Sequence, residues 1–90
     1  MNKILLVEDD ATMLSLLQTL LQLEGFEVCQ VNLDQVDGIV SEIRREKPDL
    51  TLIDVHLRQI SGLEILEQIR QDAELKDIFV TTQLSEITFH

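Results

Sequence analysis

The sequence predicts an α/β domain in which parallel strands alternate with helices. Two observations carry this prediction. Short continuous apolar runs alternate with longer runs of helical periodicity, and the order is strand then helix three times, followed by one more strand. Such alternation implies parallel strands joined by right-handed crossover helices. With 90 residues, the chain has room for a single domain, 1–90.

Four short segments are expected to be strands. The first, 3–7, is a continuous apolar run that ends in acidic residues, which is typical of a strand buried on both faces. The others are 26–31, 50–55 and 78–82, and residues 83–90 show no clear pattern.

Three segments are expected to be helices: 11–24, 34–46 and about 63–71. In the first, apolar residues recur at steps of three and four. Asp10 stands where an N-cap residue belongs, and Gly25 where a C-cap glycine belongs. Pro48 ends the second helix because it cannot continue one.

Composition excludes several classes of partner. Seventeen acidic and seven basic residues give a formal net charge of −10, which argues against binding to nucleic acid or to an anionic membrane surface. No apolar run approaches the roughly 20 residues of a membrane-spanning helix. The N-terminus lacks the pattern of a signal peptide, and the single Cys29 suits a reducing compartment. We therefore expect a cytoplasmic protein.

Acidic residues follow or interrupt two of the predicted strands. Glu8, Asp9 and Asp10 follow the first strand, and Asp54 stands one residue before the end of the third. Acidic residues that follow a strand often only cap the next helix. A carboxylate within a buried apolar run is costly, however, and such residues usually have a function. Because the carboxyl ends of parallel strands share one rim, Asp9 and Asp54 converge if their strands are neighbours.

Clustered carboxylates repel one another unless a cation lies among them. Mg²⁺ is the natural candidate, because it accepts a few carboxylates and keeps waters that a phosphate can displace. A carboxylate beside Mg²⁺ can attack a phosphoryl donor and form an aspartyl phosphate.

Three segments together resemble the receiver domains of bacterial response regulators. ILLVEDD at 4–10 resembles their opening strand, PDLTLID at 48–54 their phosphoacceptor strand, and GLEIL at 62–66 the glycine and helix start that follow. The resemblance implies a flavodoxin-like three-layer sandwich with strand order 2-1-3-4. It also implies a sensor histidine kinase or a phosphotransfer protein as partner, and small phosphodonors as alternative sources of the phosphoryl group.

The resemblance assigns roles to individual residues. Asp54 would be the phosphoacceptor and a ligand of Mg²⁺, Asp9 would bind the ion directly, and Glu8 would act mainly through water. The backbone carbonyl of His56 would complete the protein's share of the metal shell, and its imidazole would be incidental.

The sequence departs from the family pattern around the site. Thr82 and Ser85 are both candidates for the hydroxyl residue that contacts the phosphoryl group, and neither aligns cleanly. Arg58 stands where the family usually has proline, and it could supply a positive charge near the site, although such an arginine is usually just solvated.

The family's fifth strand ends in a lysine that pairs with the phosphoryl group, and none of Lys3, Lys47 and Lys76 holds that place. We therefore expect a C-terminally truncated receiver that lacks the fifth strand and last helix. One alternative is a truncated, non-switching receiver that serves as an assembly module. Another is an aspartyl-nucleophile hydrolase, but His56 stands where such enzymes usually carry a second acid.

The predicted truncation has a consequence for assembly. The strand at 78–82 would be an unpaired edge, and part of the apolar sheet face would lie bare. The sequence thus predicts a homodimer formed through the C-terminal segment. The alternative is a tail that folds back and covers its own sheet.

Overall fold

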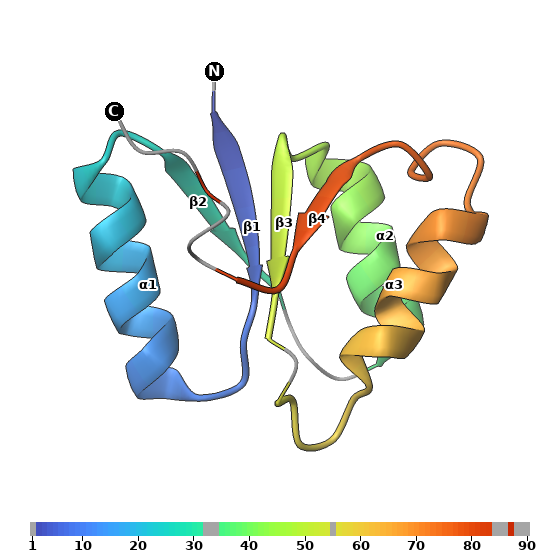
Figure 1. Cartoon of the computed structure of the whole chain (residues 1–90), viewed down its shortest axis with the longest axis horizontal. Coiled ribbons are helices and arrows are strands. Elements are labelled where there is room, and N and C mark those ends of the chain that lie inside the picture. Colours follow the sequence, from blue (N-terminus) through green and yellow to red (C-terminus); the bar gives the residue numbers. More distant parts are fainter. Residues whose placement is uncertain (1, 32–34, 55, 84–86, 88–90) are drawn as a thin grey trace.

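The structure is a computed structural model that describes residues 2–31, 35–54, 56–83 and 87. Four strands and three helices alternate along the described chain, as the hydrophobic pattern predicts (Figure 1). They are β1 (Lys3–Val7), α1 (Ala11–Leu23), β2 (Glu27–Gln30), α2 (Val36–Glu46), β3 (Leu50–Ile53), α3 (Gly62–Gln71) and β4 (Phe79–Thr81).

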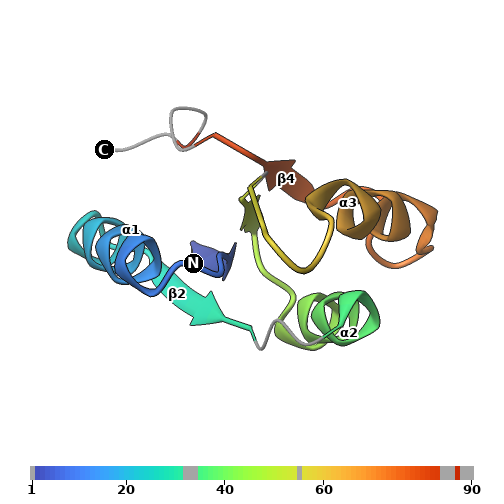
Figure 2. The ribbon, with the colours of Figure 1, turned by 90° about the horizontal axis from the view of Figure 1, so that it is seen from below.

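The strands form one parallel sheet of order β2-β1-β3-β4, which confirms the predicted fold class. Viewed from below, α1 lies on one face of the sheet, and α2 and α3 lie on the other (Figure 2). The result is the three-layer, flavodoxin-like sandwich. The sheet runs with β1 and β3 at its centre, so their carboxyl ends lie side by side.

Side chains of the buried central strands point alternately to the two faces of the sheet and contribute to two separate hydrophobic cores. Leu5, Val7 and Ile53 pack under α2 and α3, whereas Ile4 and Leu6 pack under α1. This division follows from the two-residue period of a strand, which sends neighbouring side chains to opposite faces. Because both faces are covered, β1 reads as a continuous apolar run rather than an alternating one.

Capping residues mark both ends of α1, where the sequence predicts them, and the start of α3. Asp10 Oδ1 accepts a hydrogen bond of 2.8 Å from the Met13 backbone N–H at the start of α1. Gly25 follows α1 with a φ of 92°, a conformation that costs a residue with a side chain more than it costs glycine. At the start of α3, the Ser61 hydroxyl accepts from the Glu64 N–H at 3.2 Å.

One described residue of the C-terminal segment, Ile87, packs on the sheet of its own chain. Ile87 is 7% exposed and packs in the core under α1 with Ile4, Leu6, Leu21 and Leu52. This placement agrees with the alternative in which the tail folds back, and it fills part of the face expected to lie bare. Ser85 and the rest of 84–86 and 88–90 lie outside the described residues. Within the described sheet, β4 pairs with β3 alone.

Candidate metal centre

Pairing between β1 and β3 brings the acidic residues to one place. Val7 lies opposite Ile53 in the ladder, so the residues that follow each strand emerge next to each other. The Asp54 backbone N–H donates to the Val7 carbonyl at 2.9 Å, which extends the pairing one residue beyond β3. The backbone therefore holds Asp54 beside the end of β1.

Three of the predicted site residues converge at this rim. Glu8, Asp9 and Asp54 each offer one carboxylate oxygen, and these oxygens lie within 4.8 Å of one another. Hard oxygen donors at this separation suit a small divalent cation such as Mg²⁺, which also removes their mutual repulsion. The donor set thus fits the ion that the sequence predicts.

Glu8 is the most enclosed of the three acidic residues, with 8% of the residue exposed. Its Oε2 accepts hydrogen bonds from the backbone N–H groups of Asp9, at 2.9 Å, and Asp10, at 3.1 Å. Burial raises the pKa of the Glu8 carboxyl above its ordinary value, and the neighbouring Asp54 carboxyl raises it further. The charge on Glu8 is therefore costly in the absence of a cation.

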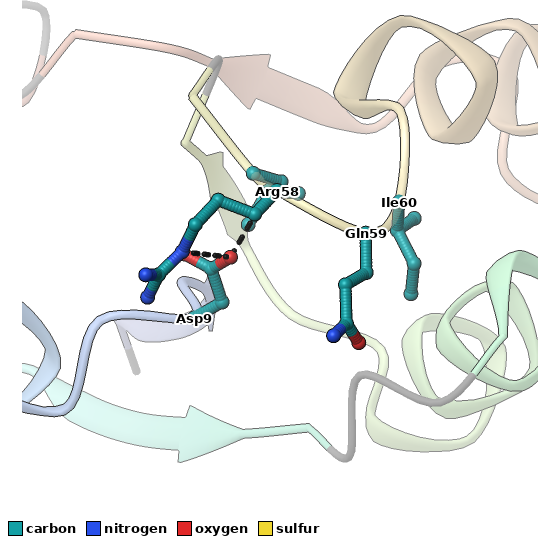
Figure 3. Close-up of a pocket in the computed structure, with 5 residues that line it drawn as sticks. Asp9, Arg58, Gln59 and Ile60 are labelled. Carbon is teal, nitrogen blue, oxygen red and sulfur yellow. Dashed lines mark hydrogen bonds and ion pairs between the residues drawn. The ribbon is translucent and has the colours of Figure 1, made fainter.

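Asp9 has a different environment, because Arg58 contacts it twice. The Arg58 backbone N–H donates to Asp9 Oδ2 at 2.9 Å, and Arg58 Nε lies 3.6 Å from the same oxygen (Figure 3). That backbone hydrogen bond, together with the guanidinium charge, lowers the pKa of the Asp9 carboxyl. Sequence reasoning placed Arg58 near the site but did not find its partner.

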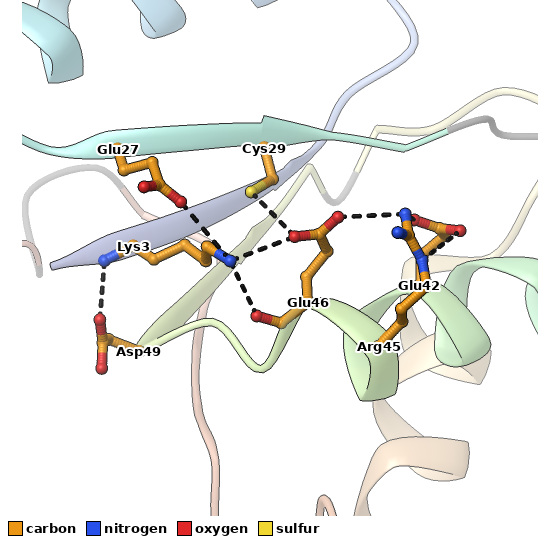
Figure 4. Close-up of polar contacts among 7 residues, drawn as sticks. All are labelled: Lys3, Glu27, Cys29, Glu42, Arg45, Glu46 and Asp49. Atoms are coloured by element: carbon orange, nitrogen blue, oxygen red, sulfur yellow. Dashed lines mark hydrogen bonds and ion pairs between the residues drawn. The ribbon is translucent and has the colours of Figure 1, made fainter. Parts of the chain in front are cut away.

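The other lysine and arginine residues lie at the opposite edge of the sheet, where the strands begin and α2 and α3 end. These six of the seven basic residues are Lys3, Arg44, Arg45, Lys47, Arg70 and Lys76. Lys3 Nζ, for example, lies 3.1 Å from Glu46 Oε1 and 3.5 Å from Glu27 Oε2 (Figure 4). Within the described part of the chain, Arg58 is the one lysine or arginine at the acidic rim.

Asp54 opens onto two shallow hollows. Its Oδ1 accepts a hydrogen bond of 2.9 Å from the His56 backbone N–H. With Glu8, Asp9, His56 and Arg58 it lines a hollow of about 500 Å³. Thr82, which follows β4 and is exposed, lines a hollow of about 200 Å³ together with Glu8 and Asp54. The structure therefore places Thr82 at the same rim as Asp54. The role of the His56 carbonyl as a metal ligand stays a prediction.

Replacing Glu8 by glutamine is expected to stabilise the metal-free protein at neutral pH. The raised pKa means that the native state holds the Glu8 proton more tightly than the unfolded chain does. Folding stability therefore falls as the pH rises above the ordinary glutamate value. Glu8→Gln removes this cost and can still accept the two backbone hydrogen bonds.

Thermal unfolding in EDTA tests this expectation. The melting temperature of Glu8→Gln should exceed that of the unmodified chain at pH 7, and the two should converge below about pH 4, where Glu8 is protonated in both states. If the variant is less stable than the unmodified chain at pH 7, the charge on Glu8 does not destabilise the native state.

Comparison with known proteins agrees with the fold and shows the family of the chain. The chain belongs to the response regulator receiver domain family, whose model matches residues 4–89. The transcriptional regulatory protein CpxR of Escherichia coli is 38% identical over 88 residues, which cover 97% of this chain and 36% of CpxR. The chain thus spans about a third of the length of the curated relatives it matches.

Two solved structures of the response regulator TrrA of Thermotoga maritima are also similar. One is a complex with Mg²⁺ and BeF, with a TM-score of 0.75 and 30% identity over 89% of this chain and 66% of that one. The other is a complex with the histidine kinase ThkA, with a TM-score of 0.73, 30% identity and the same coverage.

No helix in the described part of this chain has the length and apolar content needed to cross a membrane.

Proposed function

We propose that this receiver domain accepts a phosphoryl group on Asp54 in a Mg²⁺-dependent reaction. The convergence of Glu8, Asp9 and Asp54 within 4.8 Å at an open rim carries this proposal. Asp9 and Asp54 would hold the ion directly, Glu8 would act mainly through water, and the His56 carbonyl would complete the set. The TrrA complex with Mg²⁺ and BeF supports the choice of ion.

The chain's own residues prepare the nucleophile. The Val7 carbonyl fixes the backbone of Asp54, and the His56 N–H fixes the orientation of its carboxyl group. A carboxylate oxygen of Asp54 would attack phosphorus, the bond from phosphorus to the donor would break, and the leaving group would take the electron pair. A bound Mg²⁺ would neutralise charge on the carboxylate and on the phosphoryl oxygens. The Thr82 hydroxyl, which lines a hollow with Glu8 and Asp54, would contact the phosphoryl group.

The phosphoryl donor would be a sensor histidine kinase or a phosphotransfer protein, with small phosphodonors as substitutes. The similarity to TrrA, whose solved complex includes the histidine kinase ThkA, supports this class of partner. The single cysteine and the acidic composition support a cytoplasmic location.

The proposal is tested by the intact mass of the chain after incubation with acetyl phosphate. One phosphoryl group per chain is expected in the presence of Mg²⁺, and none in EDTA. Because hydroxylamine attacks the carbonyl carbon of an acyl phosphate and displaces phosphate, that reagent should remove the phosphoryl group and leave a hydroxamate on the same residue. A phosphoryl mass gain that survives EDTA and hydroxylamine would rule out the proposed reaction.

A second role, as an assembly module, is favoured by uncovered apolar surface. Helix α1 contains no charged residue, and Met13, Leu16, Leu20 and Leu23 are between 37% and 80% exposed along it. Ile87, in the C-terminal segment, packs in the same core as Leu21 of α1. A homodimer through the C-terminal segment and the adjoining α1 would cover it. Sedimentation at micromolar concentration distinguishes a dimer from a 10.3 kDa monomer.

A further inference from the structure

Arg58 has a position that the proposed reaction does not use. It lies in the segment between β3 and α3, and its backbone and side chain both approach a single oxygen of Asp9, Oδ2. Asp9 is at the same time one of the three acidic residues whose oxygens converge. The guanidinium and a divalent cation therefore have a common partner.

The surroundings of the pair allow it to open. The Arg58 side chain is 75% exposed, whereas that of Asp9 is 22% exposed, so the arginine reaches the carboxylate from solvent. Asp9 and Arg58 line the hollow of about 500 Å³ that Asp54 also lines, and they line a third hollow of about 260 Å³ with Leu57, Gln59 and Ile60. Figure 3 shows Arg58 facing Asp9, beside Gln59 and Ile60. Because the arginine side chain is exposed, it can leave Asp9 without disturbing the core.

Charge makes the contact specific to this residue. The other six lysine and arginine residues lie at the opposite rim, so among the described residues Arg58 is the arginine or lysine that offsets the acidic cluster. An exposed ion pair of this kind contributes little to stability, so a divalent cation can displace it.

We propose that Arg58 is an internal counter-ion of Asp9 that a divalent cation must displace, so that Arg58 weakens metal binding and couples it to the segment between β3 and α3. This inference rests on the proposed function, because it takes Glu8, Asp9 and Asp54 as the metal ligands. Metal binding removes the ion pair on Asp9 Oδ2 and releases the Arg58 side chain.

Calorimetric titration with MgCl₂ tests the proposal on the whole chain. Arg58→Gln is expected to bind Mg²⁺ about threefold more tightly than the unmodified chain after correction for the control, which is the range of an exposed ion pair. The control is Arg45→Gln, which loses the same charge from a side chain that is 67% exposed and pairs with Glu42 and Glu46 on α2. Arg58→Lys keeps the charge and is expected to restore the weaker affinity.

A second measurement follows the arginine itself. In the metal-free chain, the Arg58 Nε–H should give a nitrogen NMR signal distinct from those of solvated arginines, and Mg²⁺ should move it to the solvated position. Equal affinities of Arg58→Gln and Arg45→Gln, with Mg²⁺ still bound, would overturn the role of Arg58 and leave the proposed function intact. Absence of Mg²⁺ binding in every variant would overturn both.

Discussion

The variant Asp54→Asn is expected to gain no mass from acetyl phosphate under conditions that label the unmodified chain. An amide is not a competent nucleophile toward phosphorus, and asparagine also removes one negative charge from the three-carboxylate set. The loss should be complete, because among the described acidic residues Asp54 alone follows β3 and lies beside Glu8 and Asp9. Intact-mass spectrometry with Mg²⁺ measures it directly.

Asp10→Asn is the matched control for this variant. Asp10 is exposed at the same rim but does not belong to the converging set, and asparagine is as good an N-cap as aspartate. This variant should be labelled like the unmodified chain. Undiminished labelling of Asp54→Asn would show that phosphorylation occurs elsewhere and would remove Asp54 from the mechanism.

The variant Ile87→Ala is expected to lose about 2–5 kcal/mol of its free energy of unfolding, the range for shortening a buried isoleucine to alanine. Ile87 is 7% exposed and fills the core under α1 beside Leu21 and Leu52. A domain of this size is marginally stable, so the loss is a large fraction of the total. Urea unfolding followed by circular dichroism measures the change in midpoint.

Leu23→Ala is the control for Ile87→Ala, because Leu23 is 80% exposed at the end of α1. Its removal should change the unfolding free energy by no more than about 0.5 kcal/mol. If the two variants unfold alike, Ile87 does not pack on the sheet in solution, and the face under α1 is open to a second copy. The same samples, examined by sedimentation, would then reveal the dimer.

Most of the fold was predictable because its signals are local. The continuous run at Lys3–Val7 predicts a strand that the structure confirms, and Asp10 and Gly25 mark the two ends of α1 correctly. The structured parts of β2 and β4 are shorter than predicted, at Glu27–Gln30 and Phe79–Thr81. A strand ends where its ladder of hydrogen bonds ends, and that depends on the neighbouring strand rather than on the strand's own residues.

The convergence of Glu8, Asp9 and Asp54 was also predictable, since parallel pairing of the first and third strands leaves few other arrangements for acidic residues at their ends. Their roles in metal binding and phosphorylation stay proposals. Thr82 lies at the same rim, where the sequence alone left it level with Ser85, which is outside the described residues.

By itself, the sequence determined the alternation of strands and helices, the parallel sheet and the acidic rim. Apolar periodicity, caps and strand ends each depend on a few neighbouring residues, so they can be recognised in the sequence. Only the tertiary structure decided that Arg58 reaches Asp9 across 49 positions and that Ile87 fills the core beneath α1. Contacts of that kind depend on where the crossovers bring distant segments together, and one arginine or one isoleucine carries no local mark of its eventual partner.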